Sequence, residues 1–235
     1  MAAAQRGVAI RAALVAALLV GASAAARAQL AASVTGYSDY RFRGVSLGDD
    51  RPGVQLAVNY DTSAGWFLGA SGTGVALGRG RRYAAAMGYA GYAAVTTQGL
   101  SWELGAVASH FSGDSSYDYA EAFTGLSGER WNVRLYLAPD YFGRGVATAY
   151  LEGNGNLPLG EYARLLGHAG VLAGRGGADG SDSRRARIDG RLGGGYARDA
   201  IDLQLAWVAA TRGGPYPAVY DSRRGAWVLS VTLAF

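Results

Sequence analysis

The 235-residue sequence contains no cysteine, no lysine and only five prolines, and 17% of its residues are charged. Without cysteine it has neither a disulfide framework nor a thiolate zinc site. Past residue 28 no run of about 18 apolar residues occurs, which excludes membrane-spanning helices. Half of the residues are apolar and 11% are aromatic, so a disordered chain is excluded too. Glycine (37 residues) and tyrosine (15 residues) are instead abundant.

The first 28 residues have the order of a secretory signal peptide. Two arginines precede the apolar run 12–20, and Ala26-Arg27-Ala28 forms a small-residue cleavage site. We therefore expect 1–28 to be a signal peptide and 29–235 to form a single domain. Removal of three arginines lowers the formal net charge from +4 to +1. The basic pI of the whole sequence thus gives no support for nucleic-acid binding, and we expect no nucleic-acid partner.

Apolar and polar residues alternate with period two through the rest of the chain. Val54, Leu56, Val58 and Tyr60 alternate with polar or small residues, and 131–138, 201–208 and 226–235 do the same. Because successive strand side chains point to opposite faces, each segment has one apolar face and one polar or small face. This pattern predicts twelve strands, at 30–43, 52–61, 66–75, 82–92, 100–111, 117–126, 130–138, 146–152, 162–172, 183–197, 201–210 and 226–235.

The lengths and number of these segments favour a membrane barrel. Most have the ~9–11 residues that a tilted strand needs to cross a bilayer, and an even strand number is typical of bacterial outer-membrane barrels. The odd-numbered connections are on average longer than the even-numbered ones, as expected for extracellular loops and periplasmic turns. We therefore predict an all-β fold, a transmembrane antiparallel β-barrel of about 12 strands in the bacterial outer membrane. A soluble β-sandwich is the alternative.

Aromatic residues near the predicted strand ends suit girdles at the two membrane interfaces; they are Tyr40, Phe42, Tyr60, Trp66, Trp102, Trp131, Trp207, Trp227 and Phe235. The last predicted strand ends at Phe235, with Leu233, Val231 and Leu229 at alternate positions before it. This ending resembles the terminal signature by which outer-membrane barrels are recognised for assembly. We accordingly expect the barrel-assembly machinery and outer-membrane lipid as partners.

A more specific resemblance lies at the start of the domain. The run Ser38-Asp39-Tyr40-Arg41-Phe42-Arg43-Gly44-Val45-Ser46, followed by Pro52 and Gln55, resembles the opening of the TorF family of porins. Tyr117-Asp118-Tyr119-Ala120-Glu121 is similar to a Y-D-Y-x-E strand of the same family. Gly53 stands where the family pattern has alanine, which leaves the expected fold unchanged. The resemblance implies an outer-membrane porin and carries over no substrate.

Charged residues gather on the polar faces of the predicted strands. With an apolar exterior, Asp39, Arg41 and Arg43 of segment 30–43 must face the lumen, since arginine facing lipid costs ~2–4 kcal/mol. The predicted lumen-lining set is Asp39, Arg41, Arg43, Arg134, Arg164, Arg185, Arg187, Asp189, Arg191 and Asp202. Such residues form either a constriction that selects small solutes or ions, or an Arg/Asp network that braces a filled interior. With Asp61 and Glu103 added, seven arginines face five acids, which indicates a weak anion preference.

Three functions compete at this point. The first is passive diffusion of small solutes through a lumen narrower than that of 16–18-stranded porins. The second is a structural or surface-recognition barrel with a plugged lumen, whose contact surface is the connection 211–225. The third is a lipid-modifying enzyme, which needs His168 beside a serine and an acid, because the adjacent Ser109 and His110 point to opposite strand faces. We favour the pore, and expect no enzymatic activity and no cofactor or metal.

Overall fold

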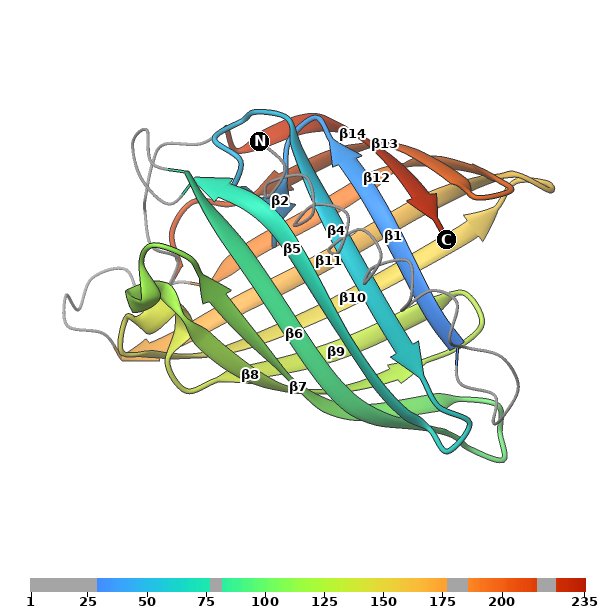
Figure 1. The fold of residues 1–235 in the computed structure, drawn as a ribbon, viewed down its shortest axis with the longest axis horizontal. Helices are drawn as coiled ribbons and strands as arrows, with labels where there is room; N and C mark the ends of the chain where they lie inside the picture. Colours follow the sequence, from blue (N-terminus) through green and yellow to red (C-terminus); the bar gives the residue numbers. More distant parts are fainter. Residues whose placement is uncertain (1–28, 77–81, 177–185, 215–222) are drawn as a thin grey trace, which may run out of the picture.

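The computed structural model describes residues 29–76, 82–176, 186–214 and 223–235. Within these ranges twelve antiparallel strands form a closed barrel, in the order β1-β14-β13-β12-β11-β10-β9-β8-β7-β6-β5-β4 (Figure 1). The prediction of a twelve-stranded antiparallel barrel is confirmed. The predicted signal peptide, 1–28, lies outside the described residues.

The barrel strands are β1 (Gln29–Tyr37), β4 (Gly53–Asp61), β5 (Trp66–Ala76), β6 (Arg82–Val95), β7 (Ser101–Phe111), β8 (Tyr119–Ser127), β9 (Trp131–Ala138), β10 (Val146–Pro158), β11 (Ala163–Gly176), β12 (Arg187–Arg198), β13 (Ile201–Ala210) and β14 (Gly225–Ala234). Two short strands, β2 (Arg41–Phe42) and β3 (Val45–Ser46), form a separate sheet. Two 3-10 turns, η1 (Ser115–Tyr117) and η2 (Tyr141–Gly143), complete the described elements. No helix of the described ranges is long and apolar enough to span a membrane.

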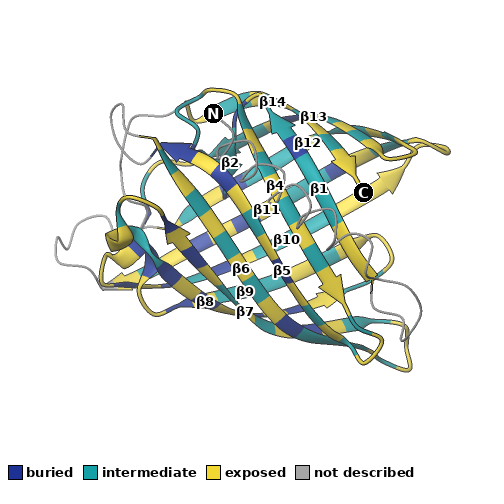
Figure 2. Ribbon diagram, in the orientation of Figure 1, coloured by how far each residue is buried: buried dark blue, intermediate teal, exposed yellow. Residues whose placement is uncertain are grey.

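The outer face of the barrel is apolar. Along β4, Val54, Leu56, Val58 and Tyr60 are exposed and alternate with less exposed residues. Figure 2 shows the same alternation of exposed and covered residues along the other strands. Water-soluble monomers rarely expose apolar patches larger than a few hundred Å², whereas an apolar outer band is what a barrel presents to lipid.

The two ends of the barrel differ. At one end, here called the turn end, consecutive strands are joined by two to five residues; at the other, the loop end, they are joined by five to fifteen. The turn end carries a ring of exposed aromatic side chains: Tyr60, Trp66, Trp102, Trp131, Tyr162, Tyr196 and Phe235. Near the loop end, Trp207 and Trp227 face each other on paired strands, with ring centroids 5.8 Å apart.

The first predicted strand is too long, because β1 ends at Tyr37. Residues 41–46 instead form a hairpin of β2 and β3, called here the lumen hairpin, which pairs Arg41 with Ser46 and Phe42 with Val45. Its turn residues, Arg43 and Gly44, have φ of 48° and 75°. A type I′ turn, whose twist matches that of the flanking strands, requires positive φ at both central residues of a two-residue hairpin loop.

The lumen hairpin lies within a hydrophobic core at the loop end. This core, called here the aromatic plug, consists of Leu47, Val75, Phe111, Tyr119, Ala138, Tyr141, Phe142, Tyr150 and Leu172. Tyr141, Phe142 and Leu172 have no exposed surface. Tyr40 and Phe42 pack against the plug, so the prediction that these two belong to a membrane-interface girdle is wrong.

Glycines lie beneath bulky side chains on the inner wall. A Cβ on Gly105 would lie 2.5 Å from Cζ of Phe123, and one on Gly170 would overlap the hydroxyl of Tyr150. A bare backbone at these positions lets an aromatic ring lie flat against the wall. Gly170, beside Tyr150, and Gly69, beside Tyr89, are thus glycines that make room for a tyrosine side chain of the lumen.

Candidate functional site

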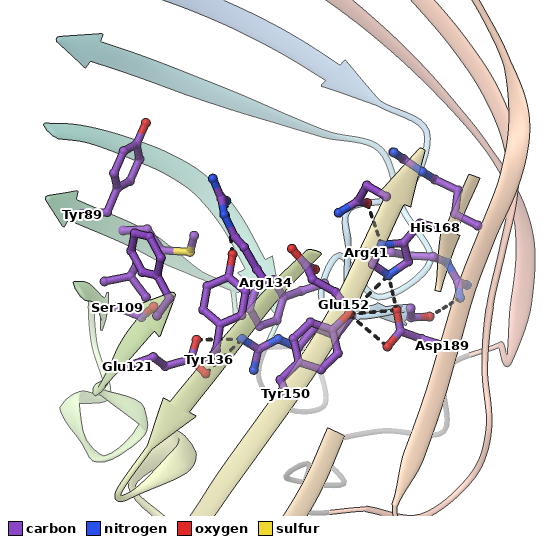
Figure 3. A pocket seen from close by; sticks show the side chains of 18 of the residues that line it. Arg41, Tyr89, Ser109, Glu121, Arg134, Tyr136, Tyr150, Glu152, His168 and Asp189 are labelled. Carbon is purple, nitrogen blue, oxygen red and sulfur yellow. Dashed lines mark hydrogen bonds and ion pairs between the residues drawn. The ribbon is translucent and has the colours of Figure 1, made fainter. Parts of the chain in front are cut away.

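A cavity of about 740 Å³ occupies the lumen between the aromatic plug and the turn end (Figure 3). Inward side chains from all twelve barrel strands line it, together with the lumen hairpin. Asp61, at the end of β4, and Phe67, near the start of β5, extend the lining towards the turn end. The volume is within the range of about 300–1,000 Å³ for small-molecule sites, and much of the lining is charged.

The central contact in the lumen is an ion pair between the hairpin and the opposite wall. Nη2 of Arg43 donates to both carboxylate oxygens of Glu121, at 2.9 and 2.8 Å. Both side chains are about 95% buried or more, with exposed fractions of 5% and 3%. Glu121 belongs to β8, which lies on the far side of the barrel from β1, with β4 to β7 between them on the shorter path. The hairpin that follows β1 therefore reaches across the lumen to β8.

Aromatic rings surround the Arg43 guanidinium. Its Cζ lies 4.1 Å from the ring centroid of Tyr150, 4.9 Å from that of Phe42, and 5.3 Å from those of Tyr136 and Tyr141. These distances are within the reach of cation–π attraction. Burial alone would lower the pKa of Arg43, but the neighbouring tyrosines and carboxylate raise it well above its ordinary value, so the guanidinium stays charged.

A second network braces the base of the lumen hairpin. Nε of Arg41 donates to Asp39 at 2.6 Å, and its Nη2 donates to Asp50 at 3.0 Å. The hydroxyl of Ser46 donates to the other oxygen of Asp39 at 2.5 Å. Asp39 and Arg41 thus hold the two hairpin strands to the connection that follows them.

Two further ion pairs lie on the barrel wall. Arg134 of β9 pairs with Glu103 of β7, with Nη2 3.0 Å from Oε2, and also donates to the hydroxyl of Tyr136 at 3.3 Å. Towards the turn end, Arg164 of β11 pairs with Asp202 of β13. Each pair joins strands that are two apart in the barrel, so it cross-links the wall.

His168 takes part in a hydrogen-bonded cluster on β10 to β12. Its Nε2 lies 2.8 Å from Asp189 and its Nδ1 lies 2.8 Å from Oδ1 of Asn154. The hydroxyl of Tyr150 donates to Asp189 at 3.2 Å. Both ring nitrogens therefore face partners inside the lumen, and no serine among the described residues contacts His168. This is not the rim arrangement that a lipid-modifying enzyme requires.

A family model described as "Bacterial protein of unknown function (Gcw_chp)" matches residues 21–235. The chain belongs to the Gcw_chp family. A search of the curated proteins found no match.

Solved structures of porins resemble this Gcw_chp barrel. The NanC porin aligns with a TM-score of 0.59 at 11% identity, over 86% of this chain and 97% of that one. The KdgM porin aligns with a TM-score of 0.56 at 11% identity, over 87% and 99%, and KdgM "in complex with disordered oligogalacturonate" aligns at 0.54 and 11%, over 88% and 99%. At such low sequence identity, the structural likeness shows the fold alone, and that fold is the one of outer-membrane porins. The TorF assignment is named by none of these comparisons and stays a prediction.

The structure places the predicted lumen residues of the Gcw_chp barrel in several locations. Asp39, Arg41 and Arg43 line the cavity from the lumen hairpin, not from a barrel strand as expected. Arg134, Asp189 and Arg191 line it from the wall. Arg164 and Asp202 pair nearer the turn end, and Arg187 donates to the carbonyl of Gly213 at 2.7 Å near the loop end. Arg185 lies outside the described residues.

The expected excess of arginine is wrong for the cavity of the Gcw_chp barrel. Among the described residues, four arginines line it (Arg41, Arg43, Arg134 and Arg191), against six carboxylates (Asp39, Asp61, Glu103, Glu121, Glu152 and Asp189). Glu121 and Glu152 are absent from the predicted lumen-lining set. Both share an inward face with aromatic residues of the plug, so the rule that the apolar face points outward misleads there. The alternation of Tyr119, Glu121 and Phe123 with small residues was the available signal.

Proposed function

We propose that this Gcw_chp protein is a narrow channel of the bacterial outer membrane, through which small hydrophilic solutes diffuse passively. The apolar outer face suits lipid, the turn end with its aromatic ring suits the periplasmic interface, and the longer connections suit the extracellular side. The observation that carries the proposal is the charged cavity of about 740 Å³, lined by all twelve strands of a porin fold.

The lining favours cations. Arg41, Arg43 and Arg134 each pair with a carboxylate, which neutralises them. The carboxylates of Asp61 and Glu152 line the cavity without a side-chain hydrogen bond or ion pair to any described residue, and so does the guanidinium of Arg191. Among the described residues, carboxylates without a partner thus exceed arginines without one in the lining. Figure 3 shows Glu152 among the side chains that line the cavity, near Arg134 and Tyr150. Acidic rings favour cations in pores.

Conductance of the refolded full domain in planar bilayers tests both statements. We expect small single-channel currents and, under a potassium chloride gradient, a reversal potential of the sign for cations. A reversal potential of the opposite sign would reject the cation preference, but the proposal that the protein is a channel would stand. A variant with residues 40–47 replaced by a short Gly-Ser linker is recorded in parallel. If neither it nor the wild type passes current, the channel proposal is rejected.

A second candidate is a structural or surface-recognition barrel with a sealed lumen. The aromatic plug favours it, since Tyr141, Phe142 and Leu172 have no exposed surface. The same recordings decide between the two functions, because a sealed barrel stays silent after the hairpin is replaced. The expected contact surface of this alternative, 211–225, lies largely outside the described residues.

A further inference from the structure

The lumen hairpin is too small to hold its position by itself. Each of its strands has two residues and they form two cross-strand pairs. An isolated hairpin, even a longer one, is at best marginally stable in water. The position of the hairpin in the lumen therefore depends on what its turn touches.

The turn touches the barrel at two places. Gly44 lies so close to the wall at β12 and β13 that a Cβ on it would be 2.7 Å from Cβ of Asp189 and 2.8 Å from the carbonyl of Ala209. Arg43, next to it, extends to Glu121 and enters a cage of rings that comprises Tyr136, Tyr141 and Tyr150 as well as Phe42 of the hairpin. A planar guanidinium suits such a site, since it stacks on rings and binds a carboxylate through a fork.

Glu121 has no other hydrogen-bonding or ion-pairing partner among the described residues. If Arg43 left the cage, Glu121 would lose both of its hydrogen bonds and its ion-pairing partner. Loss of the partner of a buried charge is strongly unfavourable. The docked position is therefore the resting one, and the Arg43–Glu121 pair stabilises it together with the Arg41 network and the packing of Phe42 against the plug.

We propose that the lumen hairpin is a latch, in which Arg43 acts as a tethered guanidinium ligand of the Glu121–tyrosine cage, and that release of Arg43 opens the loop end of the lumen. The functional consequence of the latch, a change in permeation, rests on the proposed channel function. The structural part of the proposal, release of the hairpin from the wall, can be measured without any current.

A cysteine reporter measures that release, because the natural chain has no cysteine. Ser46 of the hairpin has no exposed surface, and Ser46→Cys is nearly isosteric. The substitution removes the hydroxyl that donates to Asp39, so labelling rates are compared only between chains that all carry Ser46→Cys. In the refolded full domain we expect the reaction of this thiol with a small thiosulfonate reagent to be slow. Adding Glu121→Gln or Arg43→Ala should raise the rate at least about tenfold, and Arg43→Lys, which keeps the charge but loses the fork, should raise it less.

The matched control is Asp202→Asn in the same reporter chain. It also removes a lumen carboxylate paired with an arginine, but Asp202 pairs with Arg164 near the turn end and touches neither hairpin nor plug. We expect no change in the labelling rate. Heat-modifiable electrophoretic mobility establishes that each variant forms the barrel. Equal labelling of the reporter chain with and without Glu121→Gln and Arg43→Ala, in folded barrels, would overturn the latch.

Conductance of the same variants separates the latch from the channel. Faster labelling together with larger or more frequent currents supports both. Faster labelling with silent bilayers supports a hairpin that is released but rejects the channel. Unchanged labelling together with wild-type currents keeps the channel and rejects the latch.

Discussion

At the scale of single residues, the inner wall pairs glycine with bulky neighbours, and Gly170 of β11 shows the reason. A Cβ there would overlap the hydroxyl of Tyr150 and lie 2.7 Å from Asp189. We predict that Gly170→Ala lowers the free energy of unfolding by ~1–3 kcal/mol, as overpacking does elsewhere. Urea unfolding in vesicles, followed by tryptophan fluorescence, measures it.

The same strand supplies the control. Gly167 faces outward and has no atom within 4 Å of an added Cβ. Gly167→Ala should change the unfolding free energy by less than about 0.5 kcal/mol. Equal destabilisation by the two substitutions would contradict the packing explanation.

Glu152 is the residue on which the proposed cation preference depends most. It points into the cavity from β10 and pairs with no described side chain. We predict that Glu152→Gln moves the reversal potential in a salt gradient towards zero. Glu129, whose side chain is 87% exposed at the turn end, is screened by solvent ions, and Glu129→Gln should leave the reversal potential unchanged. If Glu129→Gln has the larger effect, selectivity does not arise in the cavity.

At the scale of elements, the sequence was sufficient to predict the barrel strands but not the lumen hairpin. Alternation of apolar and polar residues with period two identifies a strand whose two faces have different surroundings. In β4, β13 and β14 one face meets lipid and the other meets the lumen. The alternation of Tyr40 and Phe42 with Arg41 and Arg43 is in phase with that of Val34 with Ser33 and Thr35 in β1. An inward hairpin meets apolar rings on one side and charged groups on the other, so it alternates as well.

The ion-pair partners of the charged lumen residues could not be predicted from the sequence, for a similar reason. Glu121 and Arg43 are 78 positions apart in sequence, and they meet because the barrel closes and the hairpin folds inward. Strand pairing can be inferred from neighbouring segments. A contact across the lumen depends on the path of a connection, and no local pattern in residues 38–52 specifies that path.

The connection between β7 and β8 provides a prediction about pH. Slight burial raises the pKa of Asp118, but hydrogen bonds from His110 and from the Phe111 N–H, at 2.6 and 2.8 Å, outweigh it and hold the pKa below its ordinary value of 3.8. The carboxylate thus stabilises this connection fully above the unfolded pKa, and the stabilisation is lost as pH falls through the lower folded value. The protection of the Phe111 amide against hydrogen exchange should fall in that window. Asp118→Ala should abolish the step, and a step that persists would assign it to another group.

At the scale of the whole molecule, the apolar exterior predicts opposite results for adjacent residues of β14. Leu229 is 48% exposed on the outer face, whereas Ser230 lines the cavity. Leu229→Arg should cost ~2–4 kcal/mol of folding free energy in bilayers, and Ser230→Arg should cost far less. Folding titrations into lipid vesicles measure both. Equal costs would mean that the outer face does not meet hydrocarbon.

The short strand pairing at the barrel closure gives the lumen hairpin one more consequence. β1 and β14, the first and last strands, are joined by five residue pairs, fewer than any other neighbouring strands of the barrel. The hairpin begins beside this seam and reaches past it: Arg41 donates to the carbonyl of Arg223 ahead of β14, and Gly44 rests on Ala209 and Ala210 of β13. The hairpin therefore connects the segment ahead of β14 and the end of β13 to the connection that follows β1. Release of the hairpin is expected to remove these contacts across the closure of the barrel.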